Sequence, residues 1–106
     1  MTKSKPVTML VSYYPKKGKE TVLLSLIKKH WAALDRESLV TKMPAQVWRA
    51  TEKKTRRKYF VELFQWKNPE SSAIAHHTPG VMAVWEPMGV VLERMELAQI
   101  EPVRLK

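Results

Sequence analysis

The fold of this chain is decided by Lys58-Tyr59-Phe60-Val61-Glu62-Leu63-Phe64-Gln65-Trp66. We predict a β-strand here, because aromatic and β-branched residues dominate the run. Successive side chains of a strand point to opposite faces. One face carries Tyr59, Val61 and Leu63, and the other carries Phe60, Glu62, Phe64 and Trp66. Both faces are apolar, so each must be covered by a second layer of structure.

The N-terminal half supplies the neighbouring elements. Residues 7–14 and 45–52 are rich in β-formers and are predicted to be strands. The basic residues 53–57 then form the tip of a hairpin that leads into the strand described above. Between the first two strands, apolar residues recur at a spacing of four, four and three: Leu23, Ile27, Trp31 and Leu34. This spacing predicts an amphipathic helix over residues 19–36.

Two helix-start signals follow the central strand. Asn68-Pro69 and Thr78-Pro79 each place a capping residue before a proline, which loses no needed donor at the first helical position. We therefore predict short helices over residues 69–76 and 79–86.

The end of the second helix is predicted from Pro87. This residue lacks a backbone N–H and crowds the preceding turn, so the helix should end or kink just before it. Gly89 should then release the chain. We predict a last strand over residues 90–97 and a polar tail over residues 98–106.

The predicted order βαββαβ indicates an α+β, ferredoxin-like fold. In this fold a four-stranded antiparallel sheet carries its helices on one face. We expect one domain over residues 1–106, with its core in residues 7–97. The other sheet face would expose a large apolar patch, so we predict a homodimer with the two sheets face to face, a dimeric α/β barrel.

Composition limits the classes of function. The 106 residues include no cysteine, which excludes disulfides and thiolate metal sites, and no metal ligand set was identified. The short apolar run after the N-terminus predicts neither a signal peptide nor a membrane span, so we expect a cytoplasmic protein. The net charge is +9, but its densest clusters, residues 53–58 and 16–19, fall at predicted turns. This placement favours solvated loops over a nucleic-acid surface.

The central stretch resembles a known family. The residues Val61-Glu62-Leu63-Phe64-Gln65-Trp66-Lys67, then Ala75-His76, Pro79, Val81 and Val84-Trp85-Glu86-Pro87-Met88, are similar to the antibiotic biosynthesis monooxygenase-like group of dimeric α/β-barrel proteins. The resemblance covers about residues 7–97 and is closest to a subgroup of small bacterial proteins. It implies a cleft between sheet and helices for a small, often aromatic molecule, with cofactor-free oxygenation or haem degradation in the enzymes.

The haem-degrading branch does not fit this sequence. That branch uses an asparagine on the first strand, a tryptophan in the short helix and a histidine in the last helix. Here Ala75 and Trp85 hold the last two positions, and the first strand has no asparagine. We therefore expect no cofactor.

Two residues are candidates for catalysis. His76 matches the family pattern and is suited to accept a proton near neutral pH, while Glu62 would stabilise the resulting imidazolium. A buried carboxylate must find a partner or have its pKa raised, and Arg49, Arg94 and His76 are the candidate partners. Structural alternatives remain for both: His76 capping a helix end, and Glu62 in a buried ion pair. We expect His30, beside the apolar stripe of the first helix, to have a structural role.

Aromatic residues are candidates for holding a ligand. We expect Glu62, His76 and Trp85 to converge on one pocket. Its walls would be Trp31, Phe60, Phe64, Trp66 and Trp85, although a single tryptophan is more often part of a core.

The predicted function is binding of a small aromatic or enolic metabolite, with cofactor-free monooxygenation as the activity. A non-catalytic metabolite-binding or structural dimer is the alternative. The sequence argues against an RNA-binding module of the same βαββαβ order, because no glycine precedes Phe60-Val61.

Overall fold

The computed structural model describes residues 5–105. Residues 1–4, part of the segment considered as a signal peptide, and Lys106 of the predicted tail lie outside the described residues. The elements follow the order β1 (Val7–Pro15), α1 (Glu20–Arg36), β2 (Gln46–Thr51), β3 (Lys58–Trp66), α2 (Ser71–Ala75), α3 (Pro79–Val91) and β4 (Leu92–Ile100).

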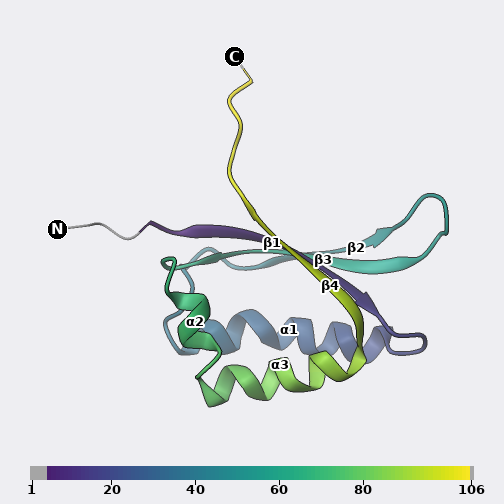
Figure 1. Cartoon of the computed structure of the whole chain (residues 1–106), viewed down its shortest axis with the longest axis horizontal. Coiled ribbons are helices and arrows are strands. Elements are labelled where there is room, and N and C mark those ends of the chain that lie inside the picture. The colour runs from purple at the N-terminus through teal and green to yellow at the C-terminus, as the bar shows by residue number, and fades with distance from the viewer. Residues whose placement is uncertain (1–4, 106) are drawn as a thin grey trace.

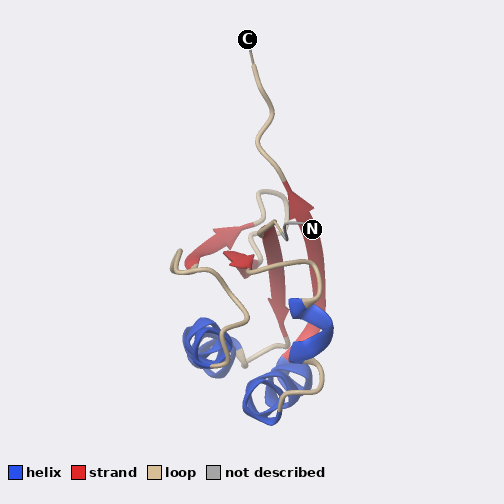
Figure 2. Cartoon of the chain, turned by 90° about the vertical axis from the view of Figure 1, so that its left-hand side faces the viewer, coloured by secondary structure: helices blue, strands red, loops and turns tan. Residues whose placement is uncertain are grey.

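The strands form an antiparallel sheet in the order β2-β3-β1-β4. The helices lie together on one face of it, as Figures 1 and 2 show. This arrangement confirms the predicted ferredoxin-like α+β fold.

The register of β3 explains which side chains meet the helices. Phe60 lies opposite Tyr13 of β1, and Glu62 lies opposite Val11. Directly paired residues share a face of the sheet, and this face is buried against the helices. The alternation predicted for β3 is confirmed, because Phe60, Glu62, Phe64 and Trp66 are buried while Tyr59, Val61 and Leu63 are half-buried.

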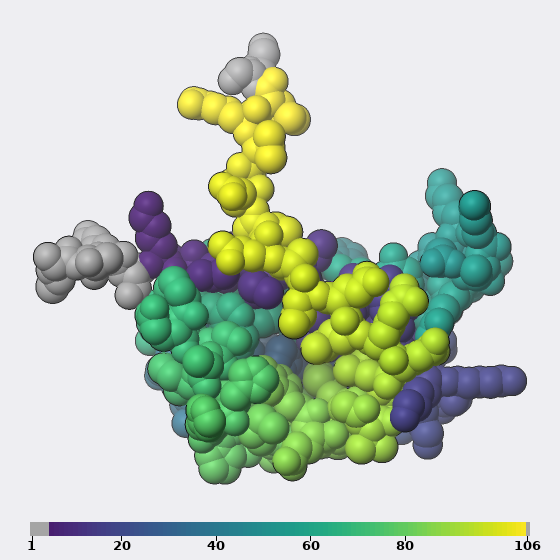
Figure 3. Space-filling model, in the orientation of Figure 1, coloured from purple at the N-terminus to yellow at the C-terminus, as the bar shows by residue number. Residues whose placement is uncertain are grey.

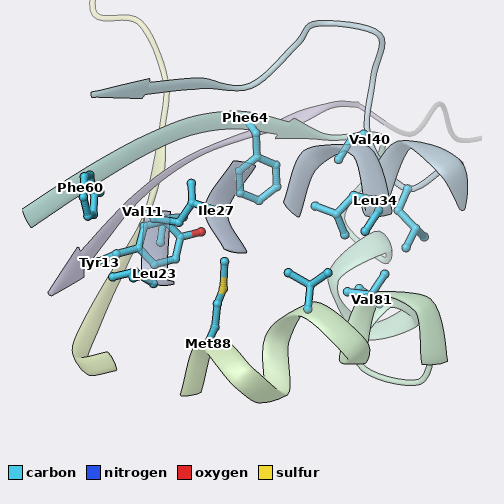
Figure 4. Close-up of a cluster of buried hydrophobic side chains, with 14 of the residues drawn as sticks. Val11, Tyr13, Leu23, Ile27, Leu34, Val40, Phe60, Phe64, Val81 and Met88 are labelled. Carbon is cyan, nitrogen blue, oxygen red and sulfur yellow. The ribbon is translucent and has the colours of Figure 1, made fainter. Parts of the chain in front are cut away.

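The core lies between the sheet and the helices α1 and α3. Figure 4 shows Met88 reaching from α3 toward the side chains of Val11, Tyr13 and Phe64 on the sheet. On α1, the buried positions are Leu23, Ile27, His30, Ala33 and Leu34, and on α3 they are Val81, Val84, Met88 and Val91. Each fully buried aliphatic side chain contributes about 1.5–3 kcal/mol, so these two stripes fix both helices on the sheet.

The predicted end of α3 is wrong. The helix continues through the exposed Pro87 and through Gly89 to Val91. An interior proline costs about 3 kcal/mol, but continuing the helix buries both Met88 and Val91, at about 1.5–3 kcal/mol each. Burial of Met88 and Val91 in the core therefore outweighs the tendency of Pro87 to end the helix. As a result, β4 begins at Leu92 and extends to Ile100, into the predicted tail.

The start of α2 differs in detail from the prediction. Asn68 does not cap the helix; its Oδ1 accepts hydrogen bonds from the Glu70 backbone N–H at 3.0 Å and from the Ser71 hydroxyl at 3.1 Å. The residues after Asn68 therefore form a turn, and the helix covers only Ser71–Ala75.

Residues 101–105 extend away from the rest of the molecule (Figure 1). Within residues 5–105, every helix is too short or too polar to cross a membrane.

Candidate functional site

A cavity of about 340 Å³ opens between the helix-facing side of the sheet and the helices. Its walls are mainly apolar and come from β1, β3, β4, α2 and α3, with one residue from α1. The lining residues are Met9, Val11, Tyr13, His30, Phe64, Trp66, Ser72, His76, Met82, Trp85, Glu86, Met88, Gly89, Leu92, Met95 and Leu97. This size and polarity are typical of a site for a small organic molecule.

Glu62 lies behind this cavity, in a buried network with two other side chains. The carboxylate has no exposed surface. The Tyr13 hydroxyl donates to its Oε1 at 2.5 Å, and His30 Nδ1 lies 2.9 Å from Oε1 and 3.2 Å from Oε2. The three partners considered from the sequence were wrong, because no hydrogen bond or ion pair joins Arg49, Arg94 or His76 to Glu62.

The protonation of this network follows from its contacts. Burial raises the pKa of Tyr13 well above 10.0, and the adjacent Glu62 charge and hydrogen bond raise it further. Tyr13 therefore stays protonated and donates to the carboxylate. A carboxylate accepts hydrogen bonds, so the contact assigns the Nδ1–H donor to His30, and in the tautomer with its proton on Nδ1 the other ring nitrogen, Nε2, is an acceptor.

His30 Nε2 is the polar atom of this network that has no hydrogen-bond partner among the described residues. It is buried, and the His30 side chain forms part of the cavity wall. A buried acceptor without a partner costs about 1–3 kcal/mol. A ligand that donated a hydrogen bond to Nε2 would remove this cost.

Aromatic rings surround His30 on the cavity side. Phe64 meets the imidazole edge-on at 5.5 Å between ring centres, and Trp66 packs edge-on against Phe64 at 5.0 Å. Trp85 lies 6.1 Å from His30. The structure thus brings three of the five predicted aromatic residues to the cavity, whereas Phe60 and Trp31 do not line it. Phe60 is buried in the core, and Trp31 is half-buried on α1.

His76 borders the same cavity from the end of α2. Its side chain is exposed, and its ring centre lies 4.8 Å from that of Trp85. Among residues 5–105, its side chain makes no hydrogen bond. Its role as proton acceptor stays a prediction.

Sequence reasoning did not predict that His30 and Tyr13 contact Glu62. A signal for His30 was present, because it lies three residues after Ile27 and four before Leu34, on the apolar stripe of α1. A histidine on such a stripe must be buried and needs a partner.

Within the described chain, no group of His, Asp or Glu side chains is arranged to hold a metal ion.

Solved structures share this fold at low sequence identity. SnoaB, a cofactor-independent oxygenase from Streptomyces nogalater, has a TM-score of 0.70 at 13% identity, covering 95% of this chain and 96% of that one. Rv0793 from Mycobacterium tuberculosis has a TM-score of 0.70 at 12% identity, covering 94% and 97%. An antibiotic biosynthesis monooxygenase has a TM-score of 0.68 at 12% identity, covering 92% of this chain and 99% of that one.

The chain therefore has the fold of antibiotic biosynthesis monooxygenase-like proteins, as its resemblance implied. The sequence itself matches no family model, and it matches no curated protein.

Proposed function

We propose that this chain binds a small aromatic or enolic molecule in the cavity and oxygenates it without a cofactor. The observation that carries the proposal is the unpartnered Nε2 of His30, held by Glu62 at the wall of an apolar cavity. A carboxylate that orients an imidazole toward a ligand is the usual arrangement of a histidine base.

The cavity limits the kind of ligand. Its aromatic and methionine walls favour a flat apolar body. In the tautomer whose Nδ1–H donates to Glu62, Nε2 accepts, so the proposed ligand presents an O–H or an acidic C–H at this point. A phenol or an enolisable ketone meets both requirements.

The proposed reaction begins with proton transfer from the ligand to His30 Nε2. The imidazolium that forms is stabilised by the Glu62 carboxylate at 2.9 Å, and Tyr13 holds that carboxylate in place. The ligand anion then reacts with molecular oxygen as co-substrate. When a CH₂ group becomes C=O, one oxygen atom enters the product and the other leaves as water with the two hydrogens. No external reductant is needed for this balance.

The fold is consistent with this activity, because SnoaB is a cofactor-independent oxygenase of the same fold. The choice of base comes from this chain alone. We assign proton acceptance to His30 because it contacts Glu62, and we assign His76, beside Trp85, to holding the ligand ring at the cavity mouth.

Oxygen uptake with 2-tetralone, an enolisable aryl ketone, tests the proposal. We expect His30→Gln to lower turnover by about 100-fold or more, while binding of 2-naphthol, followed by tryptophan fluorescence, changes by less than about threefold. His76→Ala should weaken binding and leave most of the turnover.

Three results would contradict this assignment. Loss of turnover in His76→Ala with full turnover in His30→Gln would make His76 the base, as the sequence predicted. Wild-type protein that binds 2-naphthol but consumes no oxygen would support the non-catalytic binding protein. Absence of 2-naphthol binding would remove the small-molecule site.

The proposed working unit is a homodimer formed through the sheet face opposite the helices. Strand pairing places Leu10, Trp48, Val61 and Leu63 together on this face. Trp48 is 48% exposed. A contiguous apolar surface of this kind is typical of an interface between subunits.

A further inference from the structure

Two basic clusters that are far apart in the sequence line one hollow at the same end of the molecule. The hollow has a volume of about 580 Å³ and lies between the β1–α1 turn and the tip of the β2–β3 hairpin. Figures 1 and 3 show both loops at the right-hand end. The charged residues that line it are Lys16, Lys17, Arg56, Arg57 and Lys58, with Glu20 and Glu93.

Most of the positive charge in this hollow is not neutralised. Arg57 forms an ion pair with Glu93 at 2.6 Å and also donates to the Pro15 carbonyl at 3.2 Å, which fixes the hairpin against the end of β1. None of the other four cationic side chains has an ion-pair partner within residues 5–105. Like charges held close together repel each other and destabilise the fold, so an anion bound in the hollow would stabilise the folded chain.

Arg56 occupies a backbone conformation that favours glycine. Its φ is 63°, and its backbone N–H donates to the Glu52 carbonyl at 2.8 Å to close the hairpin tip. A side chain at positive φ is strained, and a loop selected for stability alone would place glycine or asparagine here. The turn does not require an arginine at this position, whereas a role for its guanidinium in the hollow would account for one.

We propose that this hollow is a second site, which binds a compact phosphate-bearing anion such as a di- or triphosphate group. Three lysines and two arginines line it, and both residue types bind phosphate oxygens. The site is concave, which suits a compact anion. No aromatic side chain lines the hollow within the described residues, so base stacking would not contribute. This interpretation replaces the expectation that the two clusters are only solvated turns.

Calorimetric titration with inorganic triphosphate at about 150 mM salt tests the site, because this ionic strength screens diffuse attraction. The site variant carries Lys16→Gln, Lys17→Gln and Arg56→Gln. The control loses the same charge at exposed positions outside the hollow, through Lys28→Gln, Lys29→Gln and Lys67→Gln.

We expect the site variant to bind at least about tenfold more weakly and the control to stay within about twofold. Equal weakening in both variants, or no binding by the wild type, would overturn the proposal.

A second pair of variants separates the role of Arg56 from the stability of its loop. Ser38, after the end of α1, also has a positive φ, of 58°. Both Arg56→Gly and Ser38→Gly remove this strain, so we expect the melting temperature to rise by a few degrees in each. Only Arg56→Gly should weaken triphosphate binding. Unchanged binding in Arg56→Gly would contradict the assignment.

The source of the phosphate group is distinguished by two further probes. Cosedimentation with vesicles that contain phosphatidylinositol bisphosphate would assign the site to a lipid headgroup. Triphosphate binding without vesicle binding would assign it to a soluble anion. Binding of single-stranded RNA without triphosphate binding would overturn the proposal, because the hollow would then belong to an extended nucleic-acid surface.

Discussion

Replacing Tyr13 by phenylalanine removes one hydrogen bond from the buried carboxylate without changing the shape of the core. Tyr13 is 2% exposed, and its hydroxyl donates to Glu62 at 2.5 Å. A hydrogen bond to a charged group contributes about 1.5–3 kcal/mol. We therefore expect the free energy of unfolding to fall by about 2 kcal/mol near pH 7, measured by urea denaturation at fixed protein concentration. Tyr59→Phe is the control, because the Tyr59 hydroxyl makes no hydrogen bond within the described residues.

The same variant predicts a pH dependence with a definite sign. The pKa of Tyr13 is raised above 10.0 in the folded chain, so an unfolded tyrosine loses its proton before the folded one does. Wild-type stability should therefore fall with rising pH between about pH 10 and the folded pKa, by about 1.4 kcal/mol per pH unit from this group. Tyr13→Phe lacks this hydroxyl, so the difference in free energy of unfolding between wild type and variant should decrease over this range. A difference that stays constant from pH 7 to pH 11 would refute the buried Tyr13–Glu62 contact.

Two further predictions concern the interface and α3. In sedimentation, Leu63→Glu should convert a dimer of the 12.3 kDa chain into a folded monomer. The control Val90→Glu, at an exposed position on α3, should leave the dimer intact. A monomeric wild type would contradict the proposed interface. Pro87→Ala restores a backbone donor inside α3 and should raise the free energy of unfolding by about 1–2 kcal/mol, because the proline cost is partly offset by greater freedom of the unfolded chain. A loss of stability would show that the proline is needed for the path of α3.

The central strand was predictable because its signal is local. Alternation along β3 correctly grouped Phe60, Glu62 and Phe64 on one face, and a carboxylate on this apolar face was correctly expected to need a partner. The end of α3 was not predictable from Pro87 alone. The deciding contribution was burial of Met88 and Val91, which depends on the position of the sheet rather than on neighbouring residues.

The candidate site was predictable only in part. Glu62 and His30 are 32 residues apart, and their contact depends on the rotation of α1 over the sheet. The apolar stripe of α1 places His30 inward, but it does not specify which strand residue the ring meets. The two basic clusters were visible in the sequence, whereas their shared hollow follows from the packing of the hairpin against the end of β1.

The imidazole nitrogens of His30 provide the most direct test of the central claim. Long-range proton–nitrogen NMR near pH 8, with His30 assigned by comparison with His30→Gln, reports which nitrogen carries the proton. We predict a proton on Nδ1 in the free protein and, on addition of 2-naphthol, a change in the Nε2 resonance that exceeds any change at His76. A proton on Nε2 in the free protein, or a response confined to His76, would contradict the proposed role of His30.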